Sequence, residues 1–285
     1  TVIESILIRS GLAVAEERLQ RMGEADLNFQ LWVVDAALQS MSVANTTLLQ
    51  AKGYPRACSD FLDAAIACGD RLVETAITHE EQNSWLCLAF EGGNDPEIVS
   101  CKLGIVDHDL YSGLLGIALF LGYLYSHTGN ENFKETAQRC LNQVDVKKHA
   151  LSKTPGAYAG LCGLLYVHMH LTKLFNSNTL QQNVSLAFDL LPEVIESDSL
   201  YDLIYGCAGA IPVLLSYCER FCDRRALELA RACGNKLLQD ASPGCAPGNL
   251  TWSLKKPRGF SHGLSGIAFA LSELAAATAE DKYLA

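Results

Sequence analysis

One histidine at the start of an apolar stretch is the side chain of this sequence best suited to exchange protons near neutral pH. His262 lies between Ser261 and Gly263, and the largely apolar residues 264–270 that follow are predicted to form a helix. An imidazole held at the N-terminus of a helix and directed away from it can serve as a general base or a proton shuttle. A histidine that only caps and packs at the helix start is the alternative, and a single histidine does not decide between the two.

A carboxylate occupies a similar place in front of another predicted helix. Asp202 lies in the stretch YDLIYGCAGA, shortly before Gly206. A carboxylate next to an imidazole holds its tautomer and raises its basicity, so Asp202 and His262 would suit each other if the fold brings them together. An acidic residue that only interacts with the helix dipole, worth about 0.3–1 kcal/mol, is the alternative. Asp107 and Asp109 precede a further helix of this kind, and for both we favour helix capping.

Four glycine pairs with the spacing GxxG indicate how these residues would be positioned. The first glycines of the four pairs are Gly113, Gly160, Gly206 and Gly263. Each pair precedes a nearly uncharged stretch that predicts a helix buried on all sides. An amphipathic helix follows each of the first three, over 133–144, 180–195 and 224–238. The chain therefore repeats a unit of two helices.

Repeated helix pairs either stack as an open solenoid or close on themselves. The uncharged helices must form an inner layer that their amphipathic partners cover. Because solenoid repeats are usually shorter and do not open each inner helix with a GxxG turn, we predict an all-α fold of the α/α toroid class. In such a double ring the four turns gather at one end, so His262 and Asp202 reach one pocket from neighbouring repeats.

The chain before the first repeat is predicted to be mostly helical. Two amphipathic helices are expected within residues 1–41 and another over 59–78. An irregular insert, 79–107, is expected to follow, with a short strand at 85–90. Turn-forming residues near 45–55 indicate a boundary, so we divide the chain into a helical segment, 1–50, and a toroid, 51–285.

Composition excludes several classes of protein. Of the 285 residues, 49% are hydrophobic and 19% charged, which is typical of a globular protein, and the formal net charge of −10 argues against a nucleic-acid partner. The uncharged stretch 110–126 approaches the length of a membrane span, but its tyrosines and glycines favour a buried helix. The 11 scattered cysteines and the lack of a signal peptide predict mostly free, buried thiols and a cytoplasmic location.

No set of metal ligands emerges from the residue pattern alone. Cys218 and Cys222 would share a face of a predicted helix and could hold zinc with a third ligand, but no further His or Cys is suitably spaced. Buried structural thiols are the commoner case. His168 and His170 diverge around their helix and cannot bind one ion together.

The four GxxG turns, with GFSHGLSGIA around His262 and YDLIYGCAGA around Asp202, resemble the lanthionine synthetase C-like cyclase family. The resemblance extends through DLYSGLLGIALFLGYL at 109–124 and GAYAGLCGLLY at 156–166. Upstream, EADLNFQLWVVDAALQSM at 24–41 resembles the end of the dehydratase region that precedes the cyclase in class II lanthipeptide synthetases. Residues 1–50 would then be the tail of a fused dehydratase.

This resemblance implies an enzyme of lanthipeptide (lantibiotic) biosynthesis that forms thioether rings. The implied reaction is a Michael-type addition of a cysteine thiol to dehydroalanine or dehydrobutyrine in a leader-bearing precursor peptide. By motif, His262 and Asp202 correspond to the histidine and aspartate implicated in acid–base steps on the thiol and the enolate. Zn²⁺ is expected for the family, where it activates the thiol.

The zinc ligands of the family are a cysteine and a later Cys-His or Cys-Cys pair, all C-terminal to the SHG histidine. This chain has no cysteine or histidine after His262. We therefore name no metal ligand here, expect the closing part of the toroid to be absent, and expect the chain alone to be inactive. A non-catalytic peptide-binding toroid is one alternative. An α/α-toroid glycosidase is another, which the few acids at the helix starts disfavour.

Overall fold

The computed structural model of this protein describes residues 22–43, 61–92, 99–147, 153–176, 180–244, 249–253 and 259–284, together with Glu16 and Leu19. The chain divides into two compact units. One consists of Thr1–Arg56 with Leu86–Ile105, and the other of Ala57–Trp85 with Val106–Ala285. The predicted division at residue 50 stays a prediction.

The first unit contains one long helix and a β-hairpin. Helix α2 (Glu24–Val43) confirms the second helix expected within 1–41, whereas the first lies almost entirely outside the described residues. Strands β3 (Leu86–Gly92) and β4 (Val99–Ile105) pair antiparallel and set Leu86 opposite Ile105. The strand predicted at 85–90 is therefore confirmed, although it starts one residue later and ends two residues later.

The second unit begins with a helix and a short hairpin. These elements are α3 (Phe61–Thr75), β1 (Ile77–His79) and β2 (Gln82–Ser84). The indole Nε1 of Trp85 donates to the Leu72 carbonyl at 2.9 Å, and the buried ring holds the hairpin against α3. The helix expected over 59–78 is confirmed over 61–75, but it ends three residues earlier than predicted because β1 begins at Ile77. The prediction that residues 79–107 are mostly irregular is wrong, since most of the described residues in this range form hairpins. Strand β2 is polar, so a hydrophobic pattern does not reveal it.

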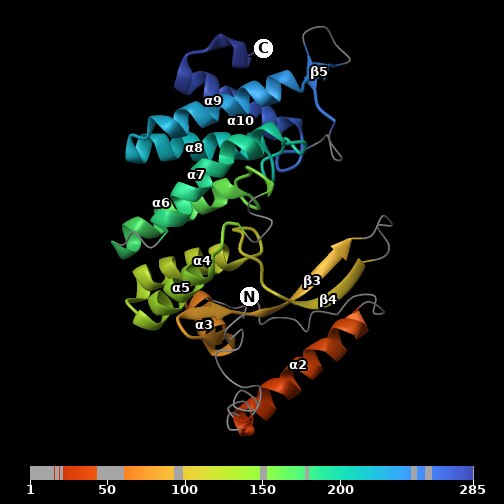
Figure 1. Ribbon diagram of the computed structural model, residues 1–285, viewed down its shortest axis with the longest axis vertical. Coiled ribbons are helices and arrows are strands. Elements are labelled where there is room, and N and C mark those ends of the chain that lie inside the picture. The colour runs from red at the N-terminus through yellow and green to blue at the C-terminus, as the bar shows by residue number, and fades with distance from the viewer. Residues whose placement is uncertain are drawn as a thin grey trace, which may run out of the picture. The chain divides into compact units, whose positions relative to one another are not determined.

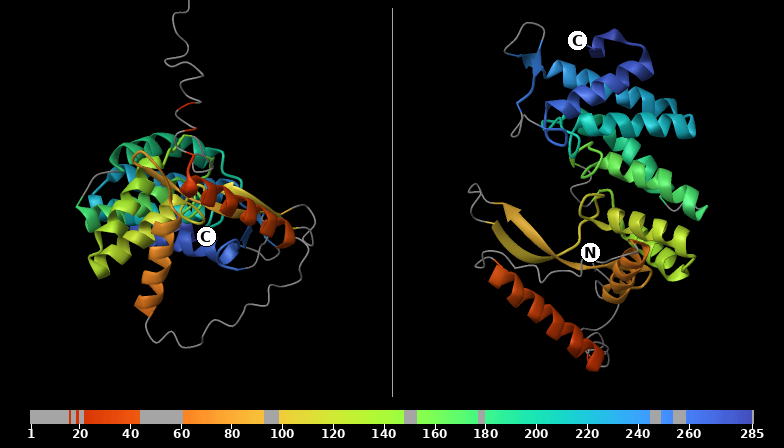
Figure 2. Two further views of the ribbon diagram at one scale, coloured as in Figure 1. Left: turned by 90° about the horizontal axis from the view of Figure 1, so that it is seen from below. Right: turned by 180° about the vertical axis from the view of Figure 1, so that it is seen from behind.

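Inner and outer helices make up most of the other described residues of the second unit (Figure 1). The inner helices are α4 (Leu114–Thr128), α6 (Leu161–Phe175), α8 (Cys207–Phe221) and α10 (Leu264–Thr278), and the outer helices are α5 (Glu131–Gln143), α7 (Gln181–Glu196) and α9 (Arg224–Gln239). Each outer helix packs on the inner helix before it, and successive inner helices pack on one another, as Figure 2 also shows. The predicted repeat and the α/α toroid class are thus confirmed.

Short elements complete the described part of this unit. Strands β5 (Ser242–Pro243) and β6 (Leu250–Thr251) pair between α9 and α10, and the 3-10 helix η2 (Asp281–Leu284) packs on α10. The small antiparallel hairpins are additions to described residues that are otherwise mostly helical.

Apolar side chains explain the two layers of helices. In α4, Leu114, Leu115 and Leu121 have no exposed surface, and the burial of each leucine stabilises the fold by about 1.5–3 kcal/mol. The outer helix α9 instead buries one face and turns charged residues outward. The uncharged stretch 110–126 thus contributes to a buried inner helix. None of the helices in the described ranges is long and apolar enough to cross a membrane.

The second glycine of each GxxG pair lies against the backbone of its own turn. A Cβ atom there would meet a carbonyl oxygen upstream, 2.6 Å from Leu110 O for Gly116, 3.0 Å from Ala157 O for Gly163, 1.9 Å from Leu203 O for Gly209 and 2.1 Å from Phe260 O for Gly266. Because these distances are shorter than ordinary van der Waals contacts, only glycine lets the turn fold back onto its helix without displacement.

His168 in α6 is a buried titratable group of the helical core. Its side chain is 3% exposed, its Nδ1 lies 3.5 Å from the Tyr217 hydroxyl, and its Nε2 has no hydrogen-bond partner among the described residues. Burial lowers the pKa of His168. The folded state therefore binds fewer protons than the unfolded state, in which the pKa is about 6.5.

We expect this histidine to make the folded state less stable as the pH falls below about 6.5. The free energy of unfolding is expected to fall by up to about 1.4 kcal/mol for each pH unit, until the pH reaches the lowered pKa of His168 in the folded state. Urea unfolding at pH 7.5 and pH 5.5 measures it. His168→Phe is expected to reduce the difference between the two pH values, whereas His127→Gln, at an exposed position, leaves it unchanged. Equal pH dependence in His168→Phe and wild type would contradict the assignment.

Candidate active site

Backbone hydrogen bonds join the four GxxG turns into one row. The Leu110 N–H donates to the Tyr158 carbonyl at 3.0 Å, the Gly156 N–H to the Tyr205 carbonyl at 2.7 Å, and the Leu203 N–H to the Ser261 carbonyl at 3.1 Å. Each of the first three turns thus donates to the turn of the next repeat. The prediction that the turns gather at one end of the inner helices is confirmed.

His262 and Asp202 are directly hydrogen-bonded. The His262 Nδ1 atom lies 2.7 Å from Asp202 Oδ2. The other carboxylate oxygen, Oδ1, accepts the Tyr205 N–H at 2.8 Å and so is held within its own turn. The Asp202 side chain is 10% exposed and the His262 side chain 42%. A largely buried carboxylate therefore holds a partly exposed imidazole.

This hydrogen bond determines how the imidazole is presented. A carboxylate can only accept, so Nδ1 of the neutral imidazole carries the hydrogen and Nε2 carries the lone pair. Within the part of the chain that the structure describes, Nε2 makes no hydrogen bond. The Tyr205 ring stacks beside the imidazole, with centroids 6.2 Å apart and planes inclined by 25°. Nε2 is therefore free to take a proton from a bound molecule.

A further carboxylate, Asp198, holds the turn that carries Asp202. It is buried, and its Oδ2 accepts the Cys207 N–H at 2.7 Å while its Oδ1 accepts the Leu200 N–H at 2.9 Å. Because Cys207 is the first residue of α8, the negative charge also interacts favourably with the helix dipole. The sequence analysis did not identify Asp198. The signal that could have found it is its position shortly before the YDLIYG turn.

Asp109 occupies the place in the first turn that Asp202 has in the third. Its Oδ1 accepts the Ser112 N–H at 2.7 Å, as Asp202 accepts the N–H of Tyr205. The helix capping predicted for Asp109 and Asp107 is wrong in this respect: the N-cap residue is Gly113, which receives no side-chain cap. Asp109 bonds within the turn, and Asp107 Oδ1 accepts the neighbouring His108 N–H at 2.7 Å. The first N–H of the helix, that of Leu114, instead donates to the Asp107 backbone carbonyl at 2.8 Å.

The carboxyl of Asp109 is close enough to affect Tyr205 beside His262. Burial raises the pKa of Asp109, and the Asp107 carboxylate adds to this effect. Burial and then the charge of Asp109 raise the pKa of Tyr205. The charge of the first turn is thus felt at the tyrosine that lies beside His262.

A cavity of about 600 Å³ lies beside the row of turns. Tyr111, Tyr158 and Leu203 from the turns and Ser216 and Phe269 from the inner helices are among the residues that line it. The prediction that the inner helices are buried on all sides is therefore wrong along one strip, because Ser216 and Phe269 face this space and are exposed.

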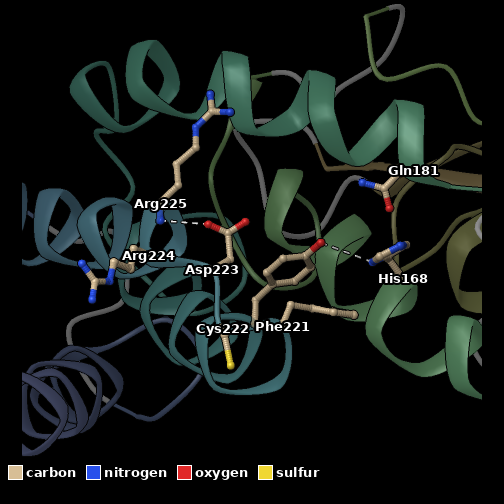
Figure 3. Close-up of a pocket in the computed structure, with 8 residues that line it drawn as sticks. His168, Gln181, Phe221, Cys222, Asp223, Arg224 and Arg225 are labelled. Carbon is tan, nitrogen blue, oxygen red and sulfur yellow. Dashed lines mark hydrogen bonds between the residues drawn. The ribbon is translucent and has the colours of Figure 1, made fainter.

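A second cavity, of about 670 Å³, is lined by residues near the C-terminal end of α8 and the start of α9 (Figure 3). His168, Cys222 and Asp223 line it, and Figure 3 shows the Arg225 backbone N–H bonded to Asp223. The Arg225 guanidinium binds Asp189 at 2.8 Å. This cavity lies at the C-terminal end of α8, whereas the GxxG turns precede the N-terminal ends of the inner helices, so it is separate from the candidate site.

The described residues contain no group of three or more His, Cys, Asp and Glu side chains that could hold a metal ion. Cys207, next to the turns, is buried, and a hydrogen bond with Cys233 together with burial raises its pKa well above the usual range. Such a thiol resists the deprotonation that zinc binding needs. Cys222 ends α8 as an exposed C-cap residue, and Cys218 is half-buried. The donor set in this region does not fit the zinc that the resemblance implies.

We expect the 285-residue chain to contain far less than one zinc per molecule when it is purified and measured by elemental analysis. A catalytic zinc needs about three protein ligands, and the described residues bring no such set together. Addition of a chelator is likewise expected to leave the thermal stability unchanged. Stoichiometric zinc would contradict this expectation, and Cys207, Cys218 and Cys222 would then be the first residues to substitute.

The fold and the site together define an α/α toroid whose GxxG turns present a His–Asp pair. A sequence model of the lanthionine synthetase C-like proteins matches residues 104–285, and the chain belongs to this family. The match covers every GxxG turn together with His262 and Asp202, and it begins after the first unit's helix.

Solved structures with a related arrangement of helices are distant in sequence. The GH76A α-1,6-mannanase from Salegentibacter sp. HEL1_6 is 13% identical, with a TM-score of 0.47 over 79% of this chain and 67% of that chain. A sugar epimerase from a ruminal bacterium is 12% identical, with a TM-score of 0.47 over 78% of this chain and 66% of that chain. The chain thus spans about two thirds of the length of these proteins.

Proposed function

We propose that this chain is the cyclase part of a class II lanthipeptide synthetase, with His262 and Asp202 as its acid–base pair. The observation that carries the proposal is the 2.7 Å hydrogen bond that joins them across neighbouring turns. Among the described residues it leaves Nε2 of His262 without a hydrogen bond, close in the chain to Phe260 of the aromatic cavity, in a chain of the lanthionine synthetase C-like family.

The proposed reaction has one proton to remove and one to deliver. His262 Nε2 takes the proton from a cysteine thiol of the peptide, and the thiolate attacks Cβ of a dehydroalanine or dehydrobutyrine. The C–S bond forms as the Cα–Cβ double bond becomes an enolate. Cα then takes the proton back from the imidazolium, which Asp202 stabilises in the meantime. The protons balance, and no redox partner is required.

The proposal also covers the setting of the reaction. The substrate is a leader-bearing precursor peptide, and the stretch 24–41 supports a fused dehydratase that prepares its dehydrated residues. Several cysteines, among them Cys140, Cys162 and Cys207, are buried free thiols, which supports the cytoplasm as the location. We assign no step to zinc, because its ligands are not found among the described residues.

The experiment that tests this function uses the full-length protein that carries this chain. A dehydrated peptide with free cysteines is incubated with it, and a thiol-alkylating reagent followed by mass spectrometry counts the thiols left. The proposed cyclase removes alkylatable thiols faster than the uncatalysed background. A non-catalytic peptide-binding toroid would bind the peptide and leave every thiol alkylatable. The glycosidase alternative gains no support, since the bonded pair is a carboxylate and an imidazole and not two carboxylates.

A further inference from the structure

The cavity beside the row of turns has apolar, aromatic walls. Tyr111, Tyr158, Phe260 and Phe269 contribute to it and are 64%, 45%, 53% and 40% exposed. None of the described residues that line it carries a formal charge. Exposed aromatic side chains gathered in one concave place indicate a binding site. The volume of about 600 Å³ lies within the usual range of ligand sites, roughly 300–1,000 Å³.

Neither His262 nor Asp202 lines this cavity, but residues close to both of them in the chain do. Leu203, which lines it, directly follows Asp202, and Phe260 lies two residues before His262. The Leu203 N–H donates to the Ser261 carbonyl at 3.1 Å, which ties these two parts of the wall together. The Phe260 and Phe269 rings are in contact, with centroids 5.4 Å apart. A molecule held at His262 therefore has this fixed apolar wall next to it.

We propose that the cavity binds the side chain of the peptide residue adjacent to the dehydrated residue, and that it selects peptides in which this neighbour is uncharged and apolar. This inference rests on the proposed function. Consecutive residues of an extended peptide lie about 3.3–3.6 Å apart, so a dehydrated residue at His262 brings its neighbour to the cavity. A lysine or glutamate there would lose its hydration, and the walls offer no charged partner in return.

A competition experiment measures this selectivity. Two dehydrated peptides that differ only in the neighbouring residue, leucine or glutamate, are mixed with the full-length protein, and mass spectrometry follows ring closure in each. The leucine peptide is expected to close about 10-fold faster or more, and a lysine peptide to behave like the glutamate one. Equal rates for leucine and the charged residues would overturn the inference.

A charge placed in the cavity tests the assignment of its walls. Ser216 lines the cavity and is exposed, so the fold tolerates Ser216→Glu. The rate of ring closure of the lysine peptide divided by that of the leucine peptide is expected to be about 5–10-fold higher in this variant than in the wild type. Phe61→Glu, at a residue that is 88% exposed and outside the cavity, is the matched control and leaves the preference unchanged. The same preference in Ser216→Glu and wild type would contradict the inference.

Photo-crosslinking separates this inference from the proposed reaction. A peptide with benzophenone in place of the neighbouring side chain is irradiated with the full-length protein, and the crosslinked fragments are sequenced by mass spectrometry. Crosslinks are expected at the walls, for example at Tyr158 or Phe269. If such crosslinks form while no ring closes, the proposed function fails and the cavity stands as a peptide-binding site. Crosslinks confined to other parts of the protein would overturn the assignment of the cavity.

Discussion

Replacement of His262 by asparagine in the full-length protein is expected to slow ring closure by about 10²–10⁴-fold and to leave dehydration unchanged. Asparagine keeps a polar side chain that can still bond to Asp202, but it cannot exchange a proton near neutral pH. Ring closure is measured by alkylation of the remaining thiols, and dehydration by the loss of water from the same peptide. Both readings come from one mass spectrum, so a general loss of folding would be recognised by the loss of both.

Asp202→Asn separates the role of the carboxylate in catalysis from its role in the turn. The amide oxygen of asparagine can still accept the Tyr205 N–H, which Asp202 accepts at 2.8 Å, so the turn is expected to keep its shape. The charge that stabilises the imidazolium of His262 is lost, and ring closure is expected to slow. Normal ring closure in both Asp202→Asn and His262→Asn would remove these residues from the mechanism.

Asp109→Asn is the matched control for this experiment. Asp109 has the same position in its repeat and makes the same bond to a turn N–H, here that of Ser112, but its oxygens are bonded to no histidine among the described residues. A smaller effect than that of Asp202→Asn is expected. Equal effects of the two variants would show that these carboxylates act on the turns and not on the imidazole.

The sequence predicted the helices well because their signals are local. The GxxG pairs and the uncharged stretches after them locate the inner helices, and the outer helices predicted over 180–195 and 224–238 appear as α7 and α9 with shifts of one residue. The repeat also predicted that His262 and Asp202 meet, since equivalent turns of neighbouring repeats must lie side by side. Their catalytic roles stay a prediction.

The remainder of the site depends on geometry that a pattern of residue types does not contain. Asp198 matters because the backbone N–H of Cys207 and that of Leu200 both point to its carboxylate, which follows from the path of the turn. Tyr205 matters because its ring lies beside His262. The aromatic cavity was missed for a related reason: a hydrophobic residue on an inner helix gives the same signal whether it faces the core or, like Phe269, an open space.

Gly209→Ala is expected to destabilise the folded chain by about 3 kcal/mol or more. Its Cβ would lie 1.9 Å from the Leu203 carbonyl oxygen, and this atom belongs to the backbone, so the turn itself has to move. Gly163→Ala is the matched control in the second repeat. There the nearest atom, the Ala157 carbonyl oxygen, is 3.0 Å away, and alanine gains about 1 kcal/mol in helix propensity over glycine, so the net change is expected to be small.

Urea unfolding of both variants and the wild type measures this difference. Because Leu203 directly follows Asp202, a displaced turn also moves the carboxylate away from His262. The Gly209→Ala variant of the full-length protein is therefore expected to lose ring closure even at temperatures where it remains folded, whereas Gly163→Ala retains it. Equal unfolding midpoints for Gly209→Ala and wild type would show that the third turn does not lie against α8 as described. The close approach that fixes the position of Asp202 would then be wrong as well.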